Sequence, residues 1–181
     1  PTTLTGTRLT GMNLTGSDLT GLDLRGAQLQ TANLSGANLS RVILNRANLQ
    51  GANLTRSILT AATLAEANLT EASLSGAELT GTVLKAVILA DAKVAGTNVS
   101  VALPDLATVD LSGADLTGSN LSRLNLSEAD LREAILTTTN FSGADLQEAN
   151  LSATNASRAA LPTADLRSAN LANANLSYAD L

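Results

Sequence analysis

Three carboxylates, Asp105, Asp110 and Asp115, stand five residues apart and are the clearest sign of chemistry in the sequence. Carboxylates that meet in space bind divalent cations or act as general acid and base. Ser and Thr are abundant, but the chain has no His and no Cys, and no base is arranged beside a hydroxyl to activate it. Whether the carboxylates meet depends on the elements that carry them.

Those elements repeat every five residues. Leu recurs at this spacing from Leu4 to Leu89 and from Leu106 to Leu181, and it occupies the centre of 32 of 36 repeats. The inner position, two residues before the centre, is usually Ala, and the outward position, one residue before it, is Asn or Asp in 23 repeats. Two corner positions follow the centre, and all 13 glycines occupy the second corner.

A period of five fits neither a helix nor a flat strand. Five residues rotate about 500° on an α-helix, so the leucines would scatter around its axis. On a flat strand an odd period sends successive leucines to opposite faces. The leucines share one core only if the chain turns once per repeat, with the inner and central residues pointing inward and the two corner residues forming the turn.

The number of sides follows from the residues that replace Ala in the inner position. If four repeats make one coil, most of these replacements gather on two neighbouring sides, whereas a three-sided coil would scatter them. One side holds Leu22, Val42, Thr82, Pro104 and Leu124, and the side before it holds Ser17, Ser57, Thr97, Ser119 and Thr139. The sequence therefore predicts an all-β, four-sided β-helix with 20 residues per coil and about nine coils.

One interruption divides the array. Ala102 and Leu103 are two extra residues between the repeats of 2–101 and those of 104–181, and spacings of 20 become 22 across them. Because the pattern of sides then resumes, we expect a two-residue bulge within a single domain, 1–181. The array begins and stops without a cap, and we expect it to be excised from a longer protein or to associate end to end.

The carboxylates can now be placed. Asp105, Asp110 and Asp115 occupy the outward position of successive sides, which face directions about 90° apart, so they are not expected to converge on one ligand. We therefore predict a protein that is not an enzyme and that holds no cofactor and no metal.

Runs such as ANLSGANLS (32–40), ADLTG (114–118) and ANLANANLS (169–177) resemble the pentapeptide-repeat family, and the resemblance covers residues 2–181. It implies a right-handed quadrilateral β-helix whose Leu and Ala positions fill the shaft. One branch of the family mimics DNA and inhibits gyrase. Another, from cyanobacteria, is linked to membranes and to the placement of heterocyst glycolipids, and this nearly loopless array resembles that branch more.

A protein-interaction scaffold is the function that the surface pattern favours. Ile43, Thr63 and Val83 stack in the outward position of one side, where Asn or Asp is usual, and Ile88 lies round the next corner. Together with Asp105 and Asp110 they form the predicted interaction surface for an unidentified protein partner. The alternative reading is that the β-branched residues stabilise the sheet through ladder contacts.

DNA mimicry is the alternative function, directed at a DNA-binding enzyme such as gyrase. Residues 104–181 hold 10 acidic and 4 basic groups, so this half is locally anionic. However, duplex DNA of the predicted length of roughly 43 Å carries about 25 negative charges, whereas the whole chain has a net charge of −5. Rows of Ser and Thr at the corners of two sides also raise the question of ice binding, but such residues are common in turns.

Composition limits the remaining possibilities. No basic cluster indicates direct binding of nucleic acid, and no apolar run approaches the roughly 18 residues of a membrane span, so we expect no membrane insertion by this segment. The cellular compartment stays open.

Overall fold

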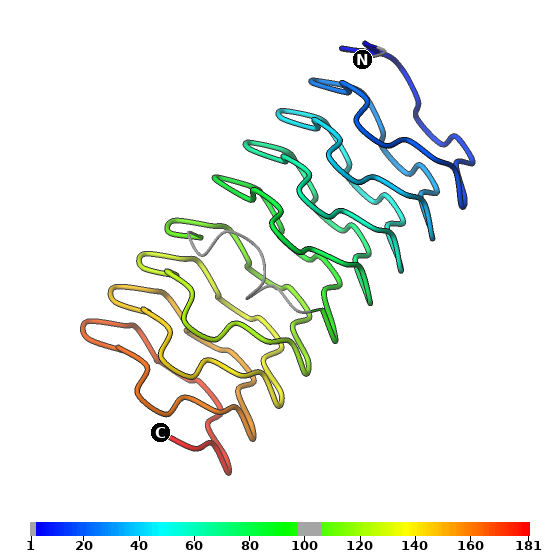
Figure 1. The fold of residues 1–181 in the computed structure, drawn as a ribbon. Helices are drawn as coiled ribbons and strands as arrows, with labels where there is room; N and C mark the ends of the chain where they lie inside the picture. Colours follow the sequence, from blue (N-terminus) through cyan, green and yellow to red (C-terminus); the bar gives the residue numbers. More distant parts are fainter. Residues whose placement is uncertain (1–2, 98–105) are drawn as a thin grey trace.

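The computed structural model describes residues 3–97 and 106–181, and these form a rod of stacked, four-sided coils (Figure 1). The two ends of the described chain lie at opposite ends of the rod (Figure 1). The bulge predicted at Ala102–Leu103 lies outside the described residues. No helix and no strand longer than a single bridge residue occurs in 3–97 and 106–181, because each straight segment is only about three residues long.

Parallel β-bridges join the coils through the outward positions. Each outward residue pairs with the residue 20 positions later, as in Ile43 with Thr63 and Thr63 with Val83. Four bridge positions occur in every coil, which confirms the predicted four sides and the 20-residue coil. Across the interruption the spacing is 22, as the sequence predicted, because Ile88 pairs with Asp110 and Lys93 with Asp115.

We name the four walls by their outward residues in chain order. Wall A carries Asp23, Ile43, Thr63, Val83, Asn125, Asp145 and Asp165; wall B carries Gln28, Asn48, Asn68, Ile88, Asp110, Asp130, Asn150 and Asn170. Wall C carries Asn13, Asn33, Asn53, Ser73, Lys93, Asp115, Ile135, Asn155 and Asn175; wall D carries Asp18, Asn38, Ile58, Glu78, Asn120, Asn140, Ala160 and Asp180. Thr3 begins wall A and Arg8 begins wall B. Each edge is named by the walls it joins, so that edge AB lies between walls A and B.

The shaft of the rod is filled by the inner and central residues. The described leucines from Leu24 to Leu161 and the inner alanines from Ala27 to Ala159 are almost wholly buried, and Phe141 replaces one central Leu with no exposed surface. Hydroxyl groups inside the shaft are paired with the backbone: Ser57 donates to the Leu54 carbonyl at 2.8 Å and Thr139 donates to the Leu116 carbonyl of the neighbouring coil at 2.8 Å. Leucine burial and paired hydroxyls therefore make a continuous core through the described coils, with a small apolar void between central residues such as Leu79 and Leu116.

The corners require an unusual backbone conformation. In each described repeat the second corner residue has a φ between 52° and 69°, the left-handed region that Gly enters without cost. All 13 glycines occupy this position, as the sequence predicted, but 21 other residues also adopt it, among them Arg41, Arg56 and Glu133. The 21 residues other than Gly therefore adopt a strained left-handed backbone conformation at the second corner.

Candidate functional site

The outward Asn and Asp side chains accept a hydrogen bond from a backbone N–H group that finds no backbone carbonyl in its own coil or the neighbouring coils. In the repeat 32–36, the N–H groups of Ala32, Asn33, Leu34 and Gly36 donate to backbone carbonyls at 2.7–3.0 Å. The fifth, the N–H of Ser35, donates to the Asn33 side-chain oxygen at 3.1 Å. Side-chain capping of the first corner therefore completes the backbone hydrogen bonds of the repeat.

This cap recurs throughout the described repeats. Within 3–97 and 106–181, every outward Asn or Asp from Asn13 to Asn175 accepts the N–H of the residue two positions later. Many corner hydroxyls bond the same oxygen, as Ser40 does to Asn38 at 2.6 Å and Ser142 to Asn140 at 2.5 Å. The hydroxyl rows thus strengthen the turns, which supports the turn-forming interpretation over ice binding.

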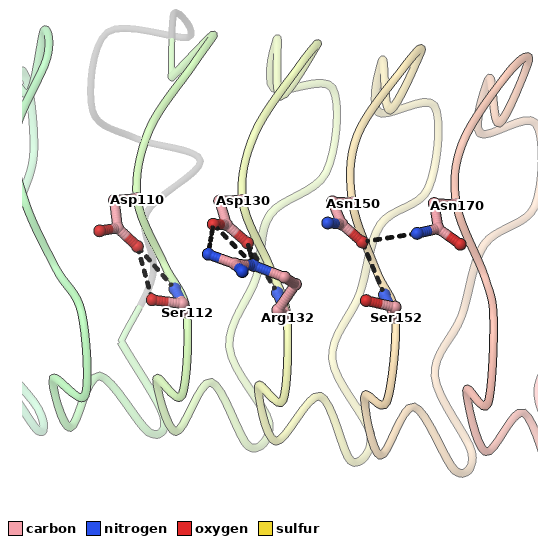
Figure 2. A network of polar contacts seen from close by, with 7 residues as sticks. All are labelled: Asp110, Ser112, Asp130, Arg132, Asn150, Ser152 and Asn170. Carbon is pink, nitrogen blue, oxygen red and sulfur yellow. Dashed lines mark hydrogen bonds and ion pairs between the residues drawn. The ribbon is translucent and has the colours of Figure 1, made fainter.

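Wall B shows the arrangement in four successive coils (Figure 2). Asp110 caps both the N–H and the hydroxyl of Ser112, at 3.0 and 2.7 Å, and Asp130 accepts hydrogen bonds from the Arg132 guanidinium at 2.5–2.9 Å. These bonds hold the pKa of Asp130 below its usual range. Asn170 donates to Asn150 at 3.1 Å, so the side chains also link the coils.

The carboxylates that opened the search for chemistry do not form a site in the described part of the rod. Asp110 lies on wall B and Asp115 on wall C, and each caps its own corner. Asp105 lies outside the described residues. No group of three or more His, Cys, Asp or Glu residues able to hold a metal ion occurs in 3–97 and 106–181. Within the same ranges no helix is long and apolar enough to cross a membrane.

The predicted interaction surface coincides with a gap in the capping pattern. Ile43, Thr63 and Val83 occupy three successive outward positions of wall A and offer no carbonyl or carboxylate oxygen to the corner. The N–H groups of Asn45 and Lys85 accordingly make no hydrogen bond to a described residue. Sequence reasoning found these residues as departures from the repeat but missed the backbone cost that they carry.

The neighbouring coil compensates for only one of these losses. The N–H of Ala65, which Thr63 leaves without a cap, donates to the Asn45 side chain of the preceding coil at 3.1 Å. The Thr63 hydroxyl is itself buried without a partner. Wall D shows both outcomes. Ile58 and Glu78 leave the corner N–H groups of Thr60 and Thr80 without a hydrogen bond to a described residue, whereas Ala160 is followed at the corner by Pro162, which has no N–H to cap.

Ile88 extends the surface round edge AB. It lies on wall B in the same coil as Val83 and pairs with Asp110 in the next coil, and 40% of the residue is exposed. The edge between carries Arg46, Glu66 and Lys85, of which Arg46 and Glu66 form an ion pair at 2.8 Å. The arrangement is an apolar strip with charged groups of both signs beside it, and it has no catalytic geometry.

Comparison with known proteins identifies the fold. The family model described as pentapeptide repeats matches residues 2–36, 23–60, 62–100, 110–147 and 149–181, in eight copies. The chain belongs to the pentapeptide-repeat family. Structures of this family are right-handed quadrilateral β-helices, so the predicted fold class is confirmed. Pentapeptide-repeat proteins of this kind are non-catalytic structural repeat proteins, as the sequence predicted.

Among solved structures, the chain is similar to HetL, a pentapeptide-repeat protein involved in heterocyst differentiation regulation from the cyanobacterium Nostoc sp. strain PCC 7120. The two share 34% identity over 98% of this chain and 88% of HetL, with a TM-score of 0.83. The plasmid-mediated fluoroquinolone resistance protein QnrB1 matches at 20% identity over 99% of this chain and 86% of its own, with a TM-score of 0.37. A search of curated protein sequences found no match.

Proposed function

We propose that this pentapeptide-repeat chain is a scaffold that binds a protein partner through the strip of wall A formed by Ile43, Thr63 and Val83, continued on wall B by Ile88. The observation that carries the proposal is that three successive outward positions of wall A lack a capping oxygen, which leaves the corner N–H groups of Asn45 and Lys85 unpaired in the described chain. Each cap contributes on the order of 1 kcal/mol. A sequence is expected to replace a stabilising capping residue by an apolar one where the surface serves binding.

The chemistry of the strip suits a protein surface. β-branched side chains in a polar wall offer an apolar patch, and Arg46, Glu66 and Lys85 on the adjoining edge supply charges of both signs. Protein interfaces combine such an apolar centre with a polar rim. A rigid wall also loses little conformational entropy on binding, because its backbone is fixed by the ladders on both sides.

Similarity to HetL favours a regulatory role for the binding. HetL is described as involved in regulation of heterocyst differentiation, and the likeness spans nearly the whole of this chain. This likeness supports the regulatory part of the proposal, and the protein partner remains part of the proposal. The glycolipid role implied by the sequence resemblance stays a prediction.

DNA mimicry has less support. Asp23, Asp130 and Asp165 each form an ion pair with the Arg two residues later, at 2.6, 2.5 and 2.7 Å. These pairs neutralise part of the acidic surface that a mimic of the DNA backbone would need. Gyrase binding would become the better proposal if purified chain inhibited supercoiling.

The test compares three immobilised chains as baits in an extract of the source cells. The native chain and the control Thr55→Ala/Ser75→Ala, altered on edge CD, should retain the same partner. The variant Ile43→Asn/Val83→Asn should lose at least tenfold in affinity for it, because it replaces the apolar strip by the ordinary repeat residue. Loss of binding by the edge CD control alone would contradict the proposal.

A further inference from the structure

Charged residues at the second corner are sorted by edge. The two edges that flank wall D carry Arg41 and Arg123 on edge DA, and Arg56 and Arg158 on edge CD. In the described repeats no acidic residue occupies a second corner on either edge. On the edges that flank wall B the sign is reversed, with one base among seven charged residues: Arg46, Glu66, Glu128, Glu148, Glu71, Asp91 and Glu133.

These arginines are kept against the conformational preference of the position. Arg41, Arg56, Arg123 and Arg158 have φ values of 56–61°, where Gly would be free of strain. None of the four forms an ion pair with a described residue, whereas the four ion pairs of the described chain lie on walls A and B and on the two edges beside wall B. Their charge is therefore available to a partner outside the chain.

Walls B and D are opposite faces of the rod and carry complementary charge. Wall D holds three acidic outward residues, Asp18, Glu78 and Asp180, beside the four arginines of its edges, so this face keeps a small positive excess in the described chain. The face of wall B also carries bases, but Arg25, Arg46, Arg132 and Arg167 are each held in an ion pair. Apart from these pairs, wall B and its edges hold two bases, Arg8 and Lys85, and six acidic residues: Glu71, Asp91, Asp110, Glu128, Glu133 and Glu148. Because the two walls face in opposite directions, a simple translation brings wall D of one copy against wall B of the next.

We propose that the partner of wall D is wall B of a second copy, so that rods associate side by side in open rows. An interface between two different surfaces of one protein does not close on itself when the copies are related by translation. Such a row leaves wall A of every copy exposed, so it would present the strip of Ile43, Thr63 and Val83 repeatedly. The inference shares only Ile88 of wall B with the proposed function, and the variant Ile43→Asn/Val83→Asn, altered on wall A, keeps the two proposals distinguishable.

The association should be weak and sensitive to salt. A wall about 10 Å wide and roughly 40 Å long buries on the order of 800 Å² in total when two copies meet, less than most specific interfaces. Exposed charges attract over about 10 Å at 0.1 M salt and over less at higher salt. We expect self-association in 20 mM NaCl at high protein concentration, and at least a tenfold lower association constant in 500 mM NaCl.

Sedimentation velocity tests the proposal with two charge-neutralising variants. One is Arg41→Gln/Arg56→Gln/Arg123→Gln/Arg158→Gln, which removes the positive charge of wall D. The other is Glu71→Gln/Glu128→Gln/Glu133→Gln/Glu148→Gln, which removes the negative charge beside wall B and lowers the net negative charge of the chain. Circular dichroism and thermal unfolding check that both keep the fold, which is expected because all eight positions are exposed corners.

The expected result has three parts. Each variant alone should be monomeric. The glutamate variant has the smaller net negative charge, so it would associate more strongly than the native chain if repulsion between whole molecules limited association. A mixture of the two should form dimers and no larger species, because one functional interface remains between them. Ile43→Asn/Val83→Asn should associate as the native chain does. A native chain that stays monomeric in 20 mM NaCl, or a glutamate variant that associates at least as strongly as native, would overturn the proposal.

Discussion

Ile88 pairs with Asp110 across 22 residues, whereas Asn68 pairs with Ile88 across 20. The two extra residues of the interruption therefore change neither the wall on which a repeat lies nor the pairing of the walls that follow. Lys93 and Asp115 on wall C keep the same register. The array behaves as one ladder on both sides of the interruption.

Deletion of Ala102 and Leu103 should consequently be tolerated. The deletion restores the 20-residue spacing throughout, so every wall keeps its neighbours and the core keeps its leucines. We expect the same all-β circular-dichroism spectrum and a midpoint of thermal unfolding within a few degrees of native. Loss of cooperative unfolding would show that the two residues are required for the stacking of the coils.

Strain at the second corner should be measurable with a matched pair of substitutions. Ala61 has a φ of 57° and Gly36 a φ of 63°, and an added methyl group at Gly36 would meet no atom within 4 Å. Ala61→Gly should stabilise the chain and Gly36→Ala should destabilise it, each by about 1 kcal/mol. Urea unfolding checks both, and equal midpoints for the two variants would contradict the strain.

The corner cap should also have a measurable contribution. Asn53 accepts the Thr55 N–H at 3.0 Å, and Asn53→Ala removes this acceptor from a half-buried donor. The substitution should lower the free energy of unfolding by about 1 kcal/mol. Asn53→Asp keeps the oxygen and serves as the control, which should remain near the native value. A loss of equal size in both variants would assign the effect to something other than the cap.

Acid should destabilise the rod through its ion-paired carboxylates. Hydrogen bonds from Arg132 and Arg167 lower the pKa values of Asp130 and Asp165 in the folded chain. A group with a depressed folded pKa contributes stability above its unfolded pKa of about 4, and this contribution is lost as the pH falls through the folded value. Unfolding measured from pH 6 to pH 2 should show this loss.

The variant Asp130→Asn/Asp165→Asn is the control for the acid effect. Asn is the other residue used in the outward position, so both caps are retained while the titrating groups and their ion pairs are removed. Its stability should fall less between pH 5 and pH 2 than that of the native chain. An identical acid dependence would place the titrating groups elsewhere.

The period of Leu and the replacements of the inner Ala were sufficient to predict the four walls, because both depend only on spacing. The role of Asn33 was not predictable in the same way, since it depends on which of five backbone donors the neighbouring coils leave unpaired. Nor does the repeat pattern reveal that Arg41 and Glu133 adopt the backbone conformation of Gly. The interaction surface of Ile43, Val83, Ile88, Asp105 and Asp110 remains a prediction, and Asp105 lies outside the described residues.

The most direct measurement is the free energy of unfolding of Ile43→Asn/Val83→Asn. If these residues serve binding, the new Asn side chains should accept hydrogen bonds from the N–H groups of Asn45 and Lys85 and so offset the lost apolar contacts. The free energy of unfolding should then lie within about 0.5 kcal/mol of the native value or above it. If they serve the sheet as ladder contacts, the double variant should lose on the order of 2 kcal/mol or more. The first result is the one that a binding strip on wall A predicts, and the second would contradict it.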